Sequence, residues 1–511
     1  MKDKKMKKIF KQILRIQLIP DKDFDKKTDE LVNHCVKFGF TEVMLMINAE
    51  EFNRGHIAKA DAEEWVKALK TAKVKLRSAG IIVSVNNWME LGHTDRNRTL
   101  LPSQNFTTMV DFNGKRCSLV ACPLCENWQR YYIDYASYLV KELDPDTFWI
   151  EDDYRYHNHG GLEWGGCFCE RHIEAFNRVA NKKYSREEWV ENIFKKGAPS
   201  EERKIWLDVS RSSLTDLAEK ISTELHRIKS NLKIGLMSSR PDYHAMEGRR
   251  WDDLLSAFAG SGEKINRIHL PCYNEGCGKD YYYDFNTVSM AVRAFCSEDT
   301  VILPETENGS ANFYRKSPRF LRFQVESAIP LVLDGMTYSI YDFVGNGVSE
   351  ESGYAREIAG LTPYLQTVED LELEFSALCG VKVPIDEACA YHKPIRKDYY
   401  DLISDSFKVG GYMSAQGVSY AYTKEKAIGG EIVALIGDAV YDFTDGELIR
   451  LFENNYVVTD GYAVSVLCEK GLGRLTKAKS VKFVKAESTL ISYEEAADGE
   501  DAIEKDEPAQ I

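Results

Sequence analysis

The stretch D-P-D-T-F-W-I-E-D-D-Y-R-Y-H-N-H-G-G-L-E-W-G-G-C-F-C-E-R-H, residues 144–172, decides how the sequence is interpreted. Its apolar run Thr147–Ile150 has the length of a buried strand, and it ends in three acids, Glu151, Asp152 and Asp153. Because such carboxylates repel one another and are costly to bury, a fold keeps them mainly for a substrate, a metal or a proton transfer. A second cluster follows with the spacing of metal ligands: Cys167, Cys169 and His172.

The composition favours a large, acidic protein. Its 511 residues suggest two to four domains, and 44% hydrophobic residues are ample for their cores. The net charge of −14 argues against nucleic acid or an anionic membrane as a partner, since both repel an acidic surface. Twelve scattered cysteines do not form a disulfide scaffold, Lys11 and Arg15 interrupt any signal-peptide core, and no apolar run could span a membrane. We therefore expect a cytoplasmic protein with reduced thiols.

Short apolar strands alternate with amphipathic helices through the first two thirds of the chain. This pattern predicts an α/β fold with a closed parallel (β/α)8 TIM barrel, whose excess over the usual ~250 residues lies in loops after the third and fourth strands. The expected strands are Ile13–Ile19, Glu42–Ile47, Ile81–Val85, Thr147–Ile150, Lys233–Met237, Arg267–Pro271, Val301–Pro304 and Leu331–Ile340. The helices between them include Ala62–Ser78, Asn127–Glu142, Leu214–Ile228 and Arg315–Ala328.

Polar and aromatic residues follow several of these strands. In such barrels the active site lies at the carboxyl ends of the strands, so these residues are candidates for contacts with a substrate, although loops are polar in general. The candidate substrate-binding residues are Asn87, Trp88, Glu151, Arg155, Tyr273, Asn274 and Tyr338. The seventh strand leads into two further acids, Glu305 and Glu307.

A smaller α/β unit with a parallel sheet is expected after the barrel. Its strands are Val381–Pro384, Glu431–Leu435 and Tyr456–Thr459, and the last is followed by a helix over Tyr462–Lys470. Residues 494–507 carry many acids and no aromatic residue, which is typical of a solvated tail. The predicted boundaries are 1–376 for a catalytic barrel, 377–490 for the second domain and 491–511 for the tail.

Acids on the fourth and seventh strands suit the cleavage of a glycosidic bond. That reaction needs two carboxyl groups flanking the bond, one as proton donor and one as nucleophile or base. A structural role in salt bridges is one alternative. The other is a metal-assisted hydrolase, with its metal among Glu151, Asp152, His157 and His159. Metal-dependent barrels usually offer several histidines on strand ends, and here the only histidine on an expected strand is His269, so a glycosidase is favoured.

Cys167, Cys169 and His172 would supply three of the four ligands of tetrahedral zinc. The fourth would come from Cys122 or Cys125, in the segment A-C-P-L-C-E-N-W. A closed four-ligand site is structural and would pin the long loop after the fourth strand. Free thiols beside a surface histidine are the alternative.

Two stretches resemble glycoside hydrolase family 42. W-I-E-D-D-Y, followed by G-C-F-C-E-R-H-I-E-A-F, resembles its strand-four region, where Asn-Glu-Tyr precedes Cys-x-Cys-x-x-Cys and a helix with Ala-Phe. P-E-T-E-N-G resembles its strand seven, where a Glu-Gln pair holds the nucleophile. The resemblance implies a retaining β-glycosidase. It also implies a second domain that is glutamine-amidotransferase-like, without an active nucleophile, and that joins chains into an oligomer, possibly a trimer.

Carried over to this chain, the resemblance implies Asp153 as acid/base and Asp152 at an Asn that touches the sugar's 2-hydroxyl. Glu307 falls at the nucleophile, with Glu305 as the fallback. The implied zinc ligands are Cys122, Cys167, Cys169 and His172, with His172 in place of a cysteine.

Two departures from the family pattern mark a divergent member. Asp153 in place of Glu loses about 1.5 Å of reach. The carboxylate of Asp152, in place of Asn, would raise the pKa of Asp153. Inversion of configuration therefore stays open, and so does a carbohydrate-binding or assembly protein on a degenerate barrel that no longer catalyses.

Overall fold

A computed structural model describes residues 9–92, 98–156, 162–163, 165–309, 312, 314–478 and 481, together with four short strands between residues 492 and 509. Its main sheet is parallel, with the strand order β10-β11-β1-β2-β3-β6-β7-β8-β9. The strands are β1 (Lys11–Ile16), β2 (Glu42–Ile47), β3 (Ile82–Asn87), β6 (Thr147–Ile150), β7 (Lys233–Ser238), β8 (Ile265–Ile268), β9 (Val301–Ile302), β10 (Glu305–Glu307) and β11 (Gly335–Ser339).

The sheet closes through its seventh strand, which is split into β9 and β10. β9 pairs with β8 and β10 pairs with β11, while Leu303 and Pro304 separate the two halves. Proline offers no N–H to a neighbouring strand, which fits an interruption at this position. A bridge between His269 and Glu305 joins β8 to β10, with Leu270 N donating to Glu305 O at 3.2 Å. The predicted (β/α)8 barrel is thus confirmed.

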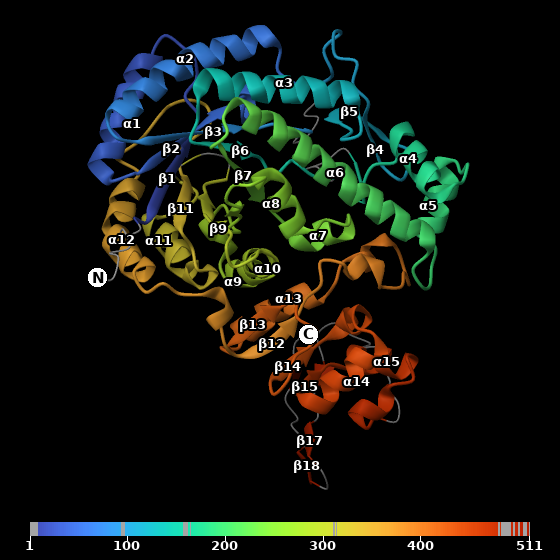
Figure 1. Cartoon of the computed structure of the whole chain (residues 1–511). Helices are drawn as coiled ribbons and strands as arrows, with labels where there is room; N and C mark the ends of the chain where they lie inside the picture. The colour runs from blue at the N-terminus through green and yellow to red at the C-terminus, as the bar shows by residue number, and fades with distance from the viewer. Residues whose placement is uncertain are drawn as a thin grey trace, which may run out of the picture.

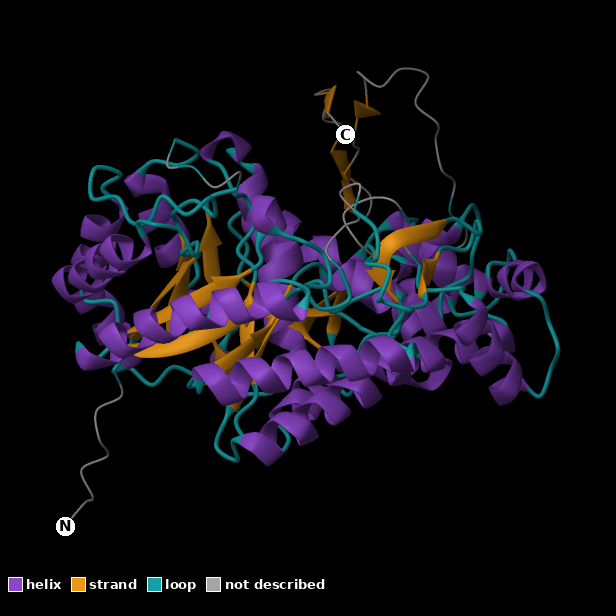
Figure 2. Cartoon of the chain, turned by 90° about the horizontal axis from the view of Figure 1, so that it is seen from above, coloured by secondary structure: helices purple, strands orange, loops and turns teal. Residues whose placement is uncertain are grey.

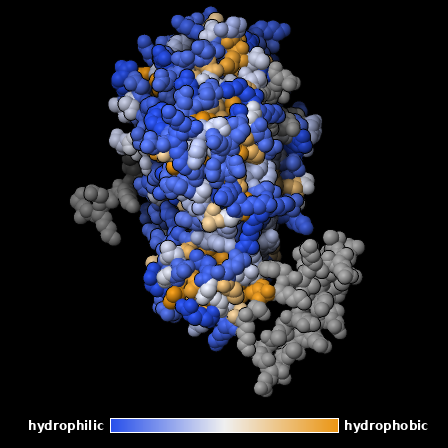
Figure 3. All heavy atoms as spheres, turned by 90° about the vertical axis from the view of Figure 1, so that its right-hand side faces the viewer, coloured by the Kyte–Doolittle hydropathy of each residue, from blue (hydrophilic) through white to orange (hydrophobic). Residues whose placement is uncertain are grey.

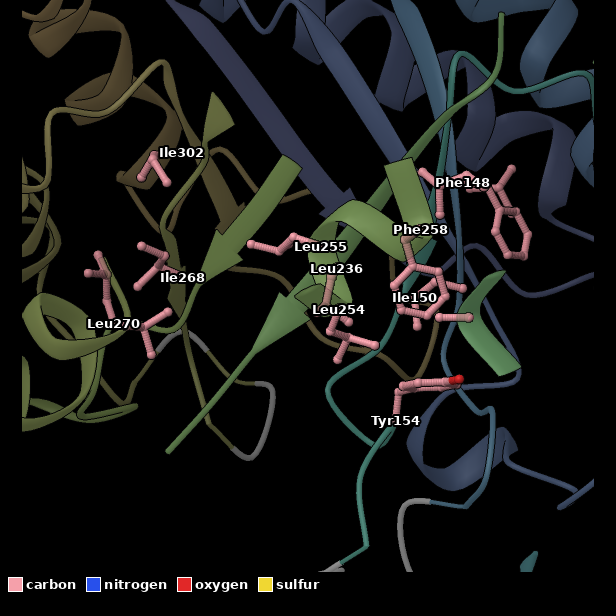
Figure 4. Close-up of a cluster of buried hydrophobic side chains, with 14 of the residues drawn as sticks. Phe148, Ile150, Tyr154, Leu236, Leu254, Leu255, Phe258, Ile268, Leu270 and Ile302 are labelled. Carbon is pink, nitrogen blue, oxygen red and sulfur yellow. The ribbon is translucent and has the colours of Figure 1, made fainter. Parts of the chain in front are cut away.

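Helices surround this sheet (Figures 1 and 2). The helices of this part of the chain are α1 (Phe24–Phe38), α2 (Lys59–Ser78), α3 (Glu126–Leu143), α4 (Glu170–Ala180), α5 (Arg186–Ile193), α6 (Glu201–Ile228), α7 (Pro241–Met246), α8 (Trp251–Ala259), α9 (Asp280–Asp284), α10 (Ala291–Phe295), α11 (Pro318–Ser327) and α12 (Tyr354–Glu369), of which α4 and α5 pack on α6. Figure 4 shows part of the core between the two layers, where Leu254, Leu255 and Phe258 of α8 lie among strand residues such as Ile150 and Leu236. Each fully buried side chain of this kind contributes about 1.5–3 kcal/mol.

The inside of the barrel is filled by a separate apolar cluster. It consists of Ile13, Met44, Trp149, Met237, Ile265 and Leu303, all at most 2% exposed. The neighbouring strand leaves room for the indole because residue 235 is glycine. A Cβ there would lie 2.5 Å from Cζ3 of Trp149. Glu151 comes two residues after Trp149, just past the end of β6, so the charged residues begin where this apolar layer ends.

Most predicted strands agree with the structure, and β2 and β6 have the predicted bounds. The eighth strand begins at Gly335 rather than Leu331, because Ile329–Leu331, with Pro330 inside it, forms a short 3₁₀ turn. The long loop after the third strand contains an unpredicted antiparallel hairpin, β4 (Thr108–Val110) and β5 (Arg116–Ala121).

A second parallel sheet follows the barrel, with the order β13-β12-β14-β15. Its strands are β12 (Val381–Pro384), β13 (Tyr420–Thr423), β14 (Ile432–Leu435) and β15 (Tyr456–Thr459), and its helices are α13 (Ser406–Ala415), α14 (Asp445–Asn454) and α15 (Gly461–Glu469). β13 was not predicted. The last barrel helix ends at Glu369 and β12 begins at Val381, on either side of the boundary predicted at 376/377, and the domain limits stay a prediction.

Near the C-terminus the structure describes only two small strand pairs. β16 (Ser492–Tyr493) pairs with β19 (Pro508–Ala509), and β17 (Ala496–Asp498) pairs with β18 (Asp501–Ile503). The other residues of the predicted tail lie outside the described residues. Among the helices described, none combines the length and apolar character that crossing a bilayer requires. The face seen in Figure 3 is mostly hydrophilic, with hydrophobic residues in small separate patches.

Candidate active site

Acids from the fourth and seventh strands meet around one buried arginine of the first strand. Arg15 Nη2 lies 2.9 Å from Glu151 Oε2, and its Nη1 lies 3.2 Å from Glu305 Oε1 and 3.4 Å from Glu307 Oε2. Arg15 is 1% exposed. The structure therefore brings Glu151, Glu305 and Glu307 together at the carboxyl ends of the barrel strands, where TIM-barrel enzymes have their sites.

Arg267 and Asn86 complete this network. Arg267 Nε lies 3.2 Å from Glu305 Oε2, and its Nη2 lies 3.4 Å from Glu151 Oε1. Asn86 Nδ2 donates to Glu151 Oε2 at 3.0 Å, and its Oδ1 accepts from Arg15 Nε at 3.1 Å. Two guanidinium groups and one amide thus fix the orientation of the acids.

The charges in this network do not balance, since three carboxylates face two guanidinium groups. Burial raises the pKa of Glu151 to about 7, against the attraction of Arg15 and Arg267. Burial, followed by repulsion from Glu305, raises the pKa of Glu307 to about 8. A proton held by one of these acids would remove the excess negative charge.

Glu307 is the member of the network that a substrate could reach. Its side chain is 18% exposed, whereas those of Glu305 and Glu151 are 0% and 3% exposed. The backbone behind it is held by Lys316, whose Nζ donates to the Glu307 carbonyl and to Thr306 Oγ1. Burial lowers the pKa of Lys316 to about 7.

Asp153, the acid/base that the resemblance implies, lies outside this network. Its carboxylate accepts hydrogen bonds from the backbone N–H of Glu90 at 3.1 Å and of Gly92 at 2.9 Å, both after β3. Asp153 is 1% exposed, and burial raises its pKa. The side chain of Glu90 faces it, and Tyr132 Oη donates to Glu90 at 3.0 Å. These bonds make Asp153 a link between the loops after the third and fourth strands.

Asp152 is placed differently. Its side chain is 12% exposed, and Oδ2 pairs with Arg155 Nη1 at 3.0 Å. Its charge acts on Arg15, on Arg267 and on the phenol of Tyr273, so it lies near these groups. Asp152 therefore joins Glu151 as a strand-four acid near Glu307, and it is the more exposed of the two.

The other candidate substrate residues fall into two groups, one near the ends of the strands and one that is buried. Tyr273 is 39% exposed, and its phenol is under the charge of Glu307. Its Cβ would lie only 2.4 Å from a Cβ at Gly309, so the loops after strands six and seven touch here. Asn274, the next residue along, is half-buried.

Three candidates are buried. Trp88 is 2% exposed in an apolar cluster with Met46 and Phe343, and Asn87 donates to the Met89 carbonyl. Tyr338 is the clearest correction, because its hydroxyl donates to Gln12 on the helix side of the sheet. Gln12 in turn donates to Thr362 of α12 at 3.1 Å. The Tyr338 side chain therefore packs between strand and helix and does not reach the site.

Several site residues were not predicted from the sequence. Arg15 and Arg267 stand alone within apolar runs, and Asn86, Lys316 and Glu90 carry no motif. A signal existed for the two arginines, because a charge in the middle of a strand of a closed barrel needs a buried partner. Their carboxylate partners lie from 38 residues away, for Arg267 and Glu305, to 292 residues away, for Arg15 and Glu307, which no local pattern reveals.

The predicted metal ligands do come together. Ligand atoms of Cys122, Cys167, Cys169 and His172, all buried, lie within 4.8 Å of one another, and this group could hold a metal ion. Cys122 Sγ is 3.3 Å from His172 Nδ1 and 3.5 Å from Cys169 Sγ. Cys122 is the fourth member, whereas Cys125 Sγ accepts a hydrogen bond from Thr107 N. Cys122 directly follows β5, and His172 lies in α4, so the cluster ties the hairpin to that helix.

The residues around the cluster suit a metal. Tyr156 Oη lies 3.0 Å from His172 Nε2, so Nδ1 faces the thiols, and Tyr156 also contacts Ser213. Three soft thiols with one imidazole are the donor set of a structural zinc site. In the described part of the chain this is the one group with such geometry. His157 and His159, proposed for a metal beside Glu151 and Asp152, lie outside the described residues.

The sequence matches no known family profile, and no curated protein matches it. The fold, however, is similar to solved structures of glycosidases. A beta-galactosidase from the psychrophilic Marinomonas ef1 matches with a TM-score of 0.55 and 12% identity, over 88% of this chain and 75% of that one. A cold-adapted beta-galactosidase from Rahnella sp. R3 matches with a TM-score of 0.52 and 11% identity, over 85% and 68%.

A third structure, alpha-L-fucosidase isoenzyme 2 from Paenibacillus thiaminolyticus, matches with a TM-score of 0.53 and 11% identity, over 88% of this chain and 64% of that one. At such identities the likeness concerns the fold alone. The chain therefore has a glycoside-hydrolase-like fold, and its own side chains must supply the argument for its activity.

Proposed function

We propose that the protein is a retaining glycoside hydrolase acting on a β-glycoside, with Glu307 as its nucleophile. The observation that carries the proposal is the convergence of strand-four and strand-seven acids at one end of the barrel, with Glu307 the most exposed member of the Arg15 network. The resemblance of the two sequence stretches to glycoside hydrolase family 42 supports the same roles for these strands.

The proposed proton donor is Asp152 rather than Asp153. Glu307 attacks the anomeric carbon while Asp152 protonates the leaving oxygen, and the Asp152 carboxylate then activates the water that releases the sugar. Asp152 is partly exposed and acts on the same tyrosine as Glu307, whereas Asp153 already accepts two backbone hydrogen bonds.

Arg15 has a defined part in this scheme. Its positive charge opposes the rise in the pKa of Glu307, so that more of the carboxylate is ionised and able to attack. The same guanidinium would stabilise the carboxylate again when the glycosyl–enzyme bond breaks.

Variants at the two neighbouring aspartates test the choice of acid. Asp152→Ala should lower kcat/KM on phenyl β-glycosides by about 10²–10⁴-fold, because a poor leaving group needs its proton. Turnover of 2,4-dinitrophenyl glycosides should fall far less, and added azide should yield a glycosyl azide. The matched Asp153→Ala should affect both substrates alike. If Asp153→Ala shows the selective loss and the azide product, Asp153 is the acid/base.

We also propose that the Cys122, Cys167, Cys169 and His172 cluster binds one structural zinc ion. The purified protein should contain about one zinc per chain by elemental analysis, as a closed four-ligand site requires. Cys169→Ser should lower both the zinc content and the thermal midpoint. Cys379→Ser is the control, since Cys379 is exposed and lies outside the cluster. A protein without zinc, with unchanged stability in Cys169→Ser, would contradict the proposal.

Self-association through the second sheet is proposed as well, with a trimer as the state that the resemblance implies. β15 is an edge strand, on which Tyr456 and Val458 are 80% and 49% exposed. Exposed apolar edges are suited to pairing with another chain. Light scattering should give a multiple of 58.3 kDa, and Tyr456→Lys with Val458→Lys should lower it. A monomeric wild-type protein would refute the idea.

The cytoplasmic location and the lack of nucleic-acid and membrane partners stay predictions.

A further inference from the structure

Asp152 is the end of a chain of polar side chains that no part of the proposed mechanism yet uses. Arg155 Nη1 lies 3.0 Å from Asp152 Oδ2 and donates to Ser239 Oγ at 2.8 Å. Ser239 Oγ lies 3.1 Å from His244 Nε2. Ser239 directly follows β7, and His244 lies in α7, so this series of hydrogen-bonded side chains joins the ends of strands four and five.

The chemistry of these groups limits the directions of the hydrogen bonds. A guanidinium can only donate, so Arg155 donates to both Asp152 and Ser239. Burial, together with Arg249 and Arg155, lowers the pKa of His244 well below its usual value, so the imidazole is neutral. Its Nδ1 lies 3.6 Å from Glu247 Oε2. Ser239 Oγ accepts from Arg155 and shares one further hydrogen bond with Nε2, in which either group donates according to the tautomer of the neutral imidazole.

The series Ser239, His244 and Glu247 could suggest an acyl-transfer triad. Two positive charges oppose that role, because Arg155 and Arg249 would destabilise the imidazolium that such a base must become. The distance of 3.6 Å to Glu247 is also longer than a hydrogen bond. His244, packed edge-on against Trp251, is better suited to hold Ser239 than to take its proton.

We propose that Ser239, oriented by His244, is a positioning residue for the proton donor Asp152, acting through Arg155. The inference rests on the proposed function. With Ser239 in place, one Arg155 N–H is engaged by Oγ and the other is aimed at Asp152. Without it, the guanidinium loses this anchor, and the carboxyl group is no longer held where the leaving oxygen must be protonated. A displacement of about 1 Å can cost about 10²-fold in rate.

The test compares Ser239→Ala with wild type on phenyl and 2,4-dinitrophenyl β-glycosides of galactose, glucose, mannose and fucose. We expect kcat/KM to fall about 10- to 100-fold on the phenyl substrates and less than about 3-fold on the dinitrophenyl ones, because only the former need a well-placed acid. Ser239→Thr keeps the hydroxyl and should restore most of the loss. Ser78→Ala, on the exposed end of α2, is the matched control.

Equal losses on both substrates, or none, would overturn the inference, and so would a Ser239→Thr variant as impaired as Ser239→Ala. Glu307→Gln in the same assay separates this outcome from failure of the proposed function. If Glu307→Gln retains full turnover, or wild type turns over none of the substrates, the glycosidase assignment itself is wrong. If Glu307→Gln is inactive and Ser239→Ala shows no selectivity, only the role of Ser239 fails.

Discussion

Glu307→Gln should lower kcat on aryl β-glycosides by at least about 10⁴-fold, because the amide cannot form the glycosyl–enzyme bond on which a retaining mechanism depends. The substitution keeps the size of the side chain and leaves Arg15 with Glu151 and Glu305 as partners. Binding of substrate should therefore survive. The loss is expected in kcat measured at saturation, with KM changed far less.

A 2-deoxy-2-fluoro glycoside with a good leaving group should identify the nucleophile directly. It should trap a covalent intermediate, visible by mass spectrometry as one added sugar on the peptide that contains Glu307. Glu326→Gln is the matched control, since Glu326 lies on the surface of α11 in an exposed pair with Arg322. A label on Glu305, or unimpaired turnover in Glu307→Gln, would show that the nucleophile is misassigned.

Arg15→Met should lower the free energy of unfolding by about 3–5 kcal/mol, the range for removing one partner from a buried charge cluster. Three carboxylates would then share the single guanidinium of Arg267, and two of them, Glu151 and Glu305, are at most 3% exposed. Urea unfolding followed by circular dichroism measures the change. Arg322→Met provides the control, because its pairs with Glu326 and Glu357 are solvent-exposed and should contribute little.

The loss in the free energy of unfolding that Arg15→Met causes, called the deficit below, should also depend on pH. In wild type the pKa values of Glu151 and Glu307 are raised to about 7 and about 8 from 4.5, so the folded state binds protons more tightly than the unfolded chain. The contribution of these acids to stability is thus present below about pH 4.5 and is lost as the pH rises towards about 8. Without Arg15 the ionised acids are costlier still, so the deficit should be larger at about pH 8 than at about pH 5. A deficit independent of pH would show that Arg15 acts through packing alone.

The barrel could be predicted because its strands are short apolar runs spaced by amphipathic helices. Thr147–Ile150 and Glu42–Ile47 were predicted with the observed bounds because both are buried along their whole length. The split of the seventh strand was not predicted. Pro304 interrupts the pairing there, but Glu305–Glu307 continues it against the opposite neighbour, and that depends on closure of the sheet rather than on local sequence.

The site was harder to predict than the fold. Glu305 and Glu307 could be found because acids that follow an apolar run are conspicuous. The sequence does not show which of Asp152 and Asp153 faces the strand ends, because adjacent residues point to opposite sides and the chain turns just after Ile150. Tyr338 was misplaced for the same reason. Both faces of its strand are buried, so composition does not show which side is inward.

The indole of Trp149 lies inside the barrel against Gly235 of the adjacent strand, beneath the charged network, with Met44 and Met237 in the same apolar cluster. That arrangement makes the barrel a dead end rather than a tunnel. In the proposed reaction a sugar would therefore reach and leave Glu307 by the same opening, and departure of the cleaved product would compete with arrival of the next molecule.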